Sequence, residues 1–295
     1  MDKEYTPVLR MLSEKGINAY IVGGYPRDIL LGFLPKDIDL ASPNTPQEII
    51  LALDDLVIEK LTKKTVNYGV INFRFQNETF EIATFRVDLD QKRNTSVAYT
   101  TKMDVDALRR DFTINSLYLD KDGVFHDPTE KGIEDIENKV LRTVGLPLTR
   151  FREDPSRILR AVRFETMGFE PEVQLKVLLK RSFTSKMLEK VSQERITKEF
   201  LKILSIDAQK GISILREYNF LKIILPEIEI AFDFDQENPR HRFDLFSHMS
   251  LAAQFIQKHG GSPVLILTGL LHDIGKPETK RWNEKRENQI ILVTK

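Results

Sequence analysis

The sequence of 295 residues contains no cysteine, which excludes disulfides, thiolate chemistry and zinc or iron–sulfur sites with cysteine ligands. It has no apolar run near the roughly 18 residues of a membrane-spanning helix, and residues 1–10 show no signal-peptide pattern. Net charge is absent too, because 44 Lys and Arg balance 44 Asp and Glu. These absences favour a soluble cytoplasmic protein without membrane contact, and the neutral total argues against a bulk nucleic-acid binder.

The first 140 residues carry the pattern of an α+β domain. A short apolar strand is predicted over residues 19–22, followed by a glycine turn and a helix that starts near Pro26. Residues 37–40 alternate as a half-buried strand does, and a helix over 46–56 and strands over 67–74 and 79–86 follow. After a polar loop we expect five buried side chains: Leu108, Phe112, Ile114, Leu117 and Leu119.

Beyond residue 140 the strand patterns end and helical periodicity takes over. Successive helices are predicted from residue 153 to 218, and two more over 246–257 and 263–274. The hydrophobic share of 41% provides enough apolar material for packed cores. We therefore expect three domains: an α+β head over 1–140, a helical neck and body over 141–220, and a helical third part over 221–295.

Two aspartates in the predicted strand at 37–40 are candidate metal ligands. Asp37 and Asp39 are two residues apart, so a strand would present both carboxylates on one face. Such a pair can bind Mg²⁺, which activates a hydroxyl and screens a triphosphate. Alone, the pattern is weak and more often marks two solvated aspartates on the exposed face of a strand.

The glycine turn before this pair is a candidate phosphate site. Gly23 and Gly24 would let the backbone approach an anion closely. Arg27 adds a planar cation that suits phosphate oxygens. In isolation, these residues also fit an ordinary turn with a surface salt bridge.

Two further segments are rich in arginine. In the first segment, Arg110 is the second of two adjacent arginines, and apolar residues surround the pair in the sequence. Near residue 155 a helix is predicted to start, with Asp154 as its N-cap and Pro155 as its first residue. This helix carries a basic ridge, because three arginines recur at every third position: Arg157, Arg160 and Arg163.

Taken together, these segments are similar to the class II tRNA nucleotidyltransferase and bacterial poly(A) polymerase family, within the polymerase-β-like nucleotidyltransferases. Each motif alone is weak, but five in family order between residues 17 and 205 are specific. They are Gly23-Gly24-x-x-Arg27-Asp28, Asp37-x-Asp39, Arg109-Arg110-Asp111-Phe112-Thr113-x-Asn115, Glu153-Asp154-x-x-Arg157 and Glu194-Arg195-Ile196. The resemblance implies a head with a small mixed sheet, then a helical neck and body.

The resemblance also implies a role for each motif residue. Asp37 and Asp39 would hold a catalytic Mg²⁺, and the phosphates and sugar of the nucleotide would be held by Gly24, Arg27 and Arg110. Asp154 and Arg157 would read the incoming base, which suits C and A because both carry an exocyclic amine. Arg160 and Arg163 would continue the contact with nucleotide or primer.

The implied reaction is attack of a tRNA 3′-hydroxyl on the α-phosphate of CTP or ATP, with release of pyrophosphate. Two departures affect the loop after the carboxylate strand. Asp90-Gln91-Lys92-Arg93 stands where the family commonly has Asp-Gly-Arg, so the role of this loop in switching from C to A is open. Ala98 stands where the family often has a carboxylate; if a base is needed there, Glu81 is the nearest substitute.

Three of the five histidines fall near the end of the sequence: His241, His248 and His272. Together with Asp273, the last two form a candidate site for Mg²⁺, Mn²⁺ or Ni²⁺, although two ordinary helix histidines fit the spacing equally well. The surrounding residues are similar to the HD phosphohydrolase family, whose domain is often fused to bacterial CCA-adding enzymes. Because the further ligands of such a site are missing before Lys295, we expect a partial HD module with little or no phosphohydrolase activity.

Three hypotheses for function remain open. The first is an enzyme that adds CCA to tRNA, or a partial version that adds only CC or only A. The second is a bacterial poly(A) polymerase, a class that is typically more basic and lacks an HD module. The third is a catalytically silent RNA-binding protein, which would be expected to have a damaged carboxylate pair. The sequence predicts no oligomeric state.

The neutral total charge is a sum over regions of opposite sign. Residues 1–140 carry 18 Lys and Arg against 24 Asp and Glu, whereas residues 141–220 carry 16 against 10. The last region is balanced, with 10 of each. The basic middle region suits a phosphate backbone, so neutrality does not exclude tRNA.

Overall fold

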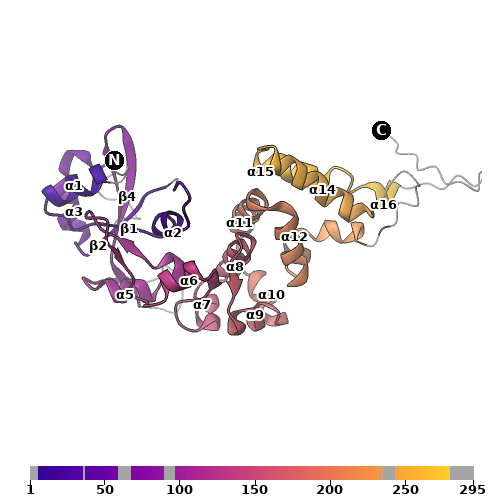
Figure 1. Cartoon of the computed structure of the whole chain (residues 1–295), viewed down its shortest axis with the longest axis horizontal. Coiled ribbons are helices and arrows are strands. Elements are labelled where there is room, and N and C mark those ends of the chain that lie inside the picture. The colour runs from indigo at the N-terminus through magenta and orange to yellow at the C-terminus, as the bar shows by residue number, and fades with distance from the viewer. Residues whose placement is uncertain are drawn as a thin grey trace, which may run out of the picture. The chain divides into compact units, whose positions relative to one another are not determined.

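The computed structural model describes residues 6–279, apart from 36, 59–67, 90–96, 233 and 235–242 (Figure 1). The chain divides into two compact units. The first unit comprises residues 1–154 and 170–175, and the second comprises residues 155–169 and 176–295. The three-domain division expected from the sequence stays a prediction.

A six-stranded mixed sheet forms the centre of the first unit, which confirms the α+β head. The strand order is β3-β4-β2-β1-β7-β8, and only the β2–β4 pair is parallel. The strands are β1 (Tyr20–Val22), β2 (Asp39–Ser42), β3 (Val70–Phe75), β4 (Glu78–Thr84), β7 (Tyr118–Leu119) and β8 (Phe125–His126). Its apolar core includes Leu9, Leu12, Ile21, Ile49, Ile71, Phe73 and Ile82, all buried.

Short helices and two small sheets complete the first unit. A capping box between Thr45 and Glu48 starts α3, with Pro46 in its first turn. The helices are α1 (Thr6–Glu14), α2 (Gly24–Leu30), α3 (Pro46–Leu53), η1 (Asp54–Leu56), α5 (Met103–Leu108), η2 (Thr113–Asn115), α6 (Gly132–Glu137) and α7 (Pro147–Glu153). The small sheets pair β5 (Arg86–Asp88) with β6 (Val97–Tyr99) and β9 (Val140–Leu141) with β10 (Glu170–Pro171).

The described residues of the second unit form helices. Its α11 and α12 pack so closely that a Cβ on Gly211 would lie 2.3 Å from Cγ2 of Ile203. The hydroxyl of buried Tyr218 donates to Glu165, which ties α12 to α8. The helices are α8 (Arg157–Thr166), α10 (Ser182–Leu188), α11 (Gln193–Ile206), α12 (Ala208–Glu217), α13 (Leu221–Ile224), η3 (Pro226–Ala231), α14 (Leu245–Lys258), α15 (Pro263–Leu271) and α16 (Lys276–Thr279); α9 (Val173–Leu179) spans the boundary between the units.

Three local expectations differ from the structure. Leu108 is 61% exposed, because the short helix α5 buries Asp106 and Ala107 instead. Asp154 is not an N-cap: it ends α7, and α8 begins at Arg157 after Ser156. The strand predicted over 37–40 begins only at Asp39, so Asp37 precedes it.

The other four side chains expected to be buried, including Phe112 and Ile114, are fully buried. Among the described residues, no helix is long and apolar enough to cross a membrane.

Candidate functional site

The two carboxylates predicted as metal ligands line a cavity of about 420 Å³ in the first unit. Asp39 is the first residue of β2 and pairs with Val22, the last residue of β1. Both Asp37 and Asp39 are exposed and line the same cavity. The structure therefore brings together the two carboxylates that the sequence predicts, although only one of them lies within the strand.

A third carboxylate lines this cavity. Glu81 on β4 stands directly opposite Asp39 in the parallel β2–β4 pair, and side chains in register on neighbouring strands share a face. Asp37, Asp39 and Glu81 supply hard oxygen donors beside open space, which is the ligand chemistry that suits a small divalent cation such as Mg²⁺. The donor set fits the metal that the resemblance implies.

The glycine turn lies between β1 and α2, next to the carboxylates. Gly23 has a φ of +75°, a region that disfavours side chains, and a Cβ there would lie 3.5 Å from Oδ2 of Asp39. A Cβ on Gly24 would lie 3.3 Å from Nη2 of Arg27. Arg27 therefore folds back over a turn that requires glycine, and the turn places this cation near the carboxylate pair.

The side-chain partners of Arg27 include Asn115 and Asp28. Its Nη1 donates to Oδ1 of Asn115 at 2.6 Å, and its Nε and Nη2 donate to Oδ1 of Asp28 at 2.9 and 2.7 Å. Asn115 in turn donates to Oδ1 of Asp111 at 3.2 Å. The Arg-Arg-Asp-Phe-Thr-x-Asn motif therefore fixes the direction of Arg27 through Asn115.

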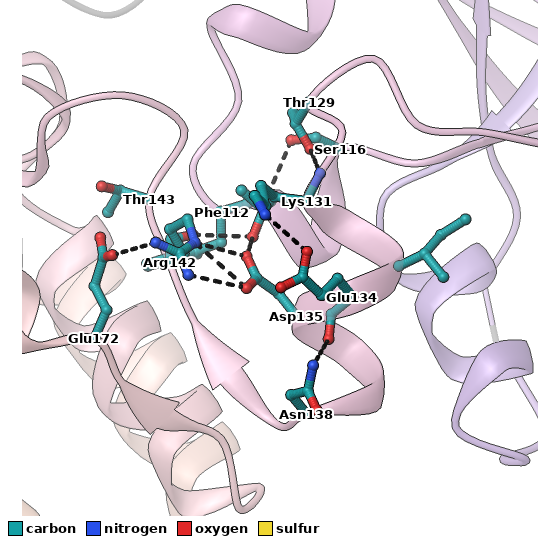
Figure 2. Close-up of polar contacts among 12 residues, drawn as sticks. Phe112, Ser116, Thr129, Lys131, Glu134, Asp135, Asn138, Arg142, Thr143 and Glu172 are labelled. Carbon is teal, nitrogen blue, oxygen red and sulfur yellow. Dashed lines mark hydrogen bonds and ion pairs between the residues drawn. The ribbon is translucent and has the colours of Figure 1, made fainter.

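The turn η2, which carries Asn115, is braced from its other side. Oγ1 of Thr113 donates to buried Asp135 on α6 at 2.7 Å. Nε of Arg142 lies 3.1 Å from the same carboxylate oxygen, and Nη1 lies 2.6 Å from Oε2 of Glu172. Figure 2 shows Arg142 between Asp135 and Glu172. None of these contacts was predicted from the sequence.

Arg110 lies in a second buried network. Its Nη2 is 3.0 Å from Oδ2 of Asp106, a carboxylate with no exposed surface. The hydroxyl of Tyr118 donates to the same oxygen at 2.7 Å. Burial would raise the pKa of Asp106, but Arg110 and Arg109 outweigh it and lower this pKa to about 2. Asp106 therefore stays ionised at neutral pH and holds both arginines.

The remaining predicted nucleotide-binding residues are divided between the two units. Asp154 is 2% exposed at the end of α7 in the first unit. The second unit carries the basic ridge on α8: Arg157, Arg160 and Arg163. Nη1 of Arg163 lies 3.2 Å from Glu199 on α11, so this arginine contributes to helix packing. Arg195 of the Glu-Arg-Ile motif donates to Oγ of Ser156, immediately before α8.

The histidine cluster lies in the second unit. Nε2 of His248 is 3.1 Å from Nε2 of His272, and Oδ2 of Asp273 is 3.3 and 3.2 Å from them. Nδ1 of His272 lies 2.8 Å from the carbonyl oxygen of Gly269. A hydrogen bond to that carbonyl requires a proton on Nδ1, and in the neutral form of the ring this leaves Nε2 as the acceptor atom that faces the cluster.

Lys276 supplies a cation to the histidine cluster, with Nζ 2.6 Å from Oδ2 of Asp273. Burial would raise the pKa of Asp273, but the hydrogen bond from Lys276 and the two histidines lower it below its usual value.

His241 and the loop residues Asp90-Gln91-Lys92-Arg93 lie outside the described residues. Ala98 lies on β6, opposite Val87.

Comparisons with known proteins match this architecture. Residues 19–142 match the family "Poly A polymerase head domain", and residues 168–232 match "Probable RNA and SrmB- binding site of polymerase A". A solved CCA-adding enzyme from Bacillus stearothermophilus, in complex with CTP, shares the fold with a TM-score of 0.67 and 25% identity, over 94% of this chain and 72% of that one.

Two relatives are CCA-adding enzymes of streptococci. The enzyme of Streptococcus gordonii is 36% identical over 68% of this chain and 50% of its own length. The enzyme of Streptococcus sanguinis is 31% identical over 97% of this chain and 68% of its own length. The chain thus spans about half the length of the first relative and about two thirds of the second. With the motifs in order on the matching fold, these similarities show that the chain belongs to the CCA-adding enzyme family.

Proposed function

We propose that this chain is a template-independent tRNA nucleotidyltransferase that adds C and A to the 3′ end of tRNA. One observation carries the proposal: Asp37, Asp39 and Glu81 line one cavity beside a glycine turn with a fixed arginine. Family membership supports the choice of tRNA, because the relatives are named CCA-adding enzymes. A cytoplasmic location remains a prediction.

The carboxylates prepare the hydroxyl of the tRNA for attack. Asp37 and Asp39 would hold Mg²⁺, which supplies charge neutralisation at the triphosphate and a lower pKa for the attacking hydroxyl. If a base is needed, Glu81, which stands opposite Asp39, would accept the proton of the 3′-hydroxyl. The bond from the 3′-oxygen to the α-phosphate then forms as the bond to pyrophosphate breaks, and positioning supplies most of the rate enhancement.

Arginines hold and select the nucleotide in this proposal. Gly24 lets the backbone approach the phosphates, and Arg27 and Arg110 donate to phosphate or sugar oxygens. Asp154 accepts from the exocyclic amine of C or A, and Arg157 donates to a ring nitrogen or carbonyl. Arg160 and Arg163 lie on the same helix and continue the contact with nucleotide or primer.

The histidine cluster is proposed as a second metal site. His248, His272 and Asp273 each offer one ligand atom within 4.8 Å of the others, and neutral imidazoles suit Mn²⁺ or Ni²⁺ as well as Mg²⁺. Because this set is small and Lys276 shares it, we predict little or no phosphohydrolase activity. Metal-dependent release of phosphate from a cyclic phosphodiester would contradict this prediction.

The alternatives within the family differ in the nucleotides added. A partial CC-adding or A-adding enzyme would use the same residues, whereas a poly(A) polymerase would extend any RNA with A. Because these relatives are named CCA-adding enzymes, they do not favour the hypothesis of a poly(A) polymerase. Both carboxylates are present at the cavity, which argues against a silent RNA-binding protein.

The test is addition of single nucleotides to three tRNAs that end in the discriminator base, in C and in CC. We expect C on the first two and A on the third. Addition of C alone or of A alone would identify a partial enzyme. Long A tails, or no addition to any tRNA, would overturn the proposal.

A further inference from the structure

A buried carboxylate, Asp106, organises the arginine pair of the first unit. Its Oδ1 accepts from Nη2 of Arg109 at 2.7 Å and from the backbone N–H of Arg86 at 3.2 Å. Its Oδ2 accepts from Nη2 of Arg110 at 3.0 Å and from the hydroxyl of Tyr118 at 2.7 Å. We name these residues the Asp106 hub. Both oxygens of one carboxylate are thus used, one for each arginine.

The hub occupies one edge of Arg110. Nε donates to the hydroxyl oxygen of Tyr118 at 3.0 Å, and both Nε and Nη2 donate to Asp106. Within the described part of the chain, Nη1 makes no hydrogen bond, and the side chain is 15% exposed. A guanidinium is planar and rigid, so holding its Nε–Nη2 edge also fixes the direction of Nη1.

Tyr118 is itself held rigidly. Its fully buried ring packs edge-on against Phe85 at 5.6 Å and against Tyr20 at 6.2 Å, and the guanidinium of Arg110 lies 4.9 Å from its centre. Burial raises the pKa of Tyr118, so its hydroxyl stays protonated. The directions of its two hydrogen bonds are therefore fixed: Tyr118 donates to Asp106 and accepts from Arg110.

We propose that Asp106 and Tyr118 are positioning residues for the nucleotide, because they aim the Nη1 end of Arg110 at a phosphate or sugar oxygen. This inference rests on the proposed function, in which Arg110 contacts the nucleotide. Asp106 and Tyr118 act through Arg110 and do not touch the substrate. Loss of either side chain should therefore weaken nucleotide binding and leave the binding of tRNA and of the metal unchanged.

Tyr118→Phe is the sharpest variant, because it removes one hydroxyl from the hub and keeps the ring. Tyr20→Phe is its matched control in the same aromatic group. We expect Tyr118→Phe to raise the Kd of CTP and ATP, and their KM, about 3- to 10-fold, the range for one buried hydrogen bond. The KM for tRNA should stay unchanged, and Tyr20→Phe should match wild type in every constant.

A double-mutant cycle tests whether Asp106 acts through Arg110. Asp106→Asn should raise the nucleotide Kd at least about 10-fold, since an amide cannot serve both arginines. In an Arg110→Gln background the same change should have no further effect on Kd. Equal effects in both backgrounds, or a Tyr118→Phe variant with wild-type nucleotide constants, would overturn the assignment. If the wild-type chain binds neither CTP nor ATP, the proposed function itself fails, and this assignment fails with it.

Discussion

The carboxylate cavity of the first unit and the histidine cluster of the second unit arrange charge in opposite ways. At the cavity, Asp37, Asp39 and Glu81 surround about 420 Å³ of open space. At the cluster, the ligand atoms lie within 4.8 Å of one another, and Lys276 already neutralises Asp273 at 2.6 Å. The carboxylates of the first site line open space that leaves room for a substrate, whereas the side chains of the second site contact one another.

The two sites also differ in how their cations are held. In the first unit, Arg27 is fixed by Asp28 and Asn115, and Arg110 by the Asp106 hub. These partners set the direction of each guanidinium before a ligand arrives, which lowers the entropic cost of binding. At the cluster, the cation Lys276 instead contacts Asp273, which is one of the candidate metal ligands. The comparison therefore predicts catalysis at the cavity and at most ion binding at the cluster.

The largest expected effect of a single change concerns Glu81. Replacing Glu81 by Gln removes a candidate base, so kcat for nucleotide addition should fall about 100-fold or more. Glu78→Gln is the matched control, because Glu78 lines the same cavity but pairs with Phe75 at the other end of the strand. Single-turnover kinetics at saturating CTP measures both. Equal losses in the two variants would remove Glu81 from the mechanism.

Arg27 tests whether an aimed cation matters for the nucleotide. Arg27→Ala should raise the KM for CTP about 10- to 100-fold, the range for losing charge-assisted hydrogen bonds. Asn115→Ala should give a smaller rise, because it loosens Arg27 without removing the charge. Thermal unfolding of both variants checks the fold. An Asn115→Ala variant with a larger effect than Arg27→Ala would contradict this order.

Asp154 tests the base-reading assignment. Asp154→Ala should reduce the preference for C and A over U and G about 10-fold, since one polar contact to a base edge carries discrimination of that order. Competition between nucleotides on a tRNA that ends in the discriminator base gives the ratio. Unchanged selectivity in a folded variant would defeat the assignment.

The Asp106 hub predicts how stability depends on pH. The pKa of Asp106 falls from an ordinary 3.8 to about 2 in the folded chain. A lowered pKa stabilises the fold above the ordinary value, and this contribution of about 2 kcal/mol is lost as the pH falls from 4 towards 2. Urea unfolding between pH 5 and 2.5 should show the loss in wild type and a flatter profile in Asp106→Asn. Parallel profiles would show that the hub does not stabilise the fold in this way.

The smallest effect is expected at the histidine cluster. His272→Ala should weaken Ni²⁺ or Mn²⁺ binding measured by calorimetry and leave nucleotide addition unchanged. His259→Ala is a control, since this exposed histidine lies outside the cluster and contacts Phe255. Loss of nucleotide addition in His272→Ala would break the separation between the two sites.

Much of the site could be predicted from short motifs, because residues a few positions apart share a turn, a strand or a helix. The glycine turn and the two aspartates required only local geometry. Asp106 was missed although it lies three and four residues before Arg109 and Arg110, because burial of that helix face does not show in a charged pattern. The wrong prediction that Leu108 is buried has the same cause, because the helix buries its other face and leaves Leu108 exposed.

Longer-range partners could not be predicted for a different reason. Glu172 meets Arg142 across 30 residues, and Asn115 meets Arg27 across 88. Both pairs depend on how the strands are ordered in space, which no local pattern encodes. The mixed sheet itself was expected from the resemblance, whereas its register, which sets Glu81 against Asp39, came only with the structure.

The most direct test measures nucleotide incorporation into a tRNA that lacks its terminal CCA. Wild type, Asp37→Ala/Asp39→Ala and His248→Ala/His272→Ala are compared side by side with CTP, ATP and Mg²⁺. The account predicts full incorporation by wild type and by the histidine variant, and none by a folded aspartate variant. Incorporation that survives loss of both aspartates, or that depends on the histidines, would contradict it.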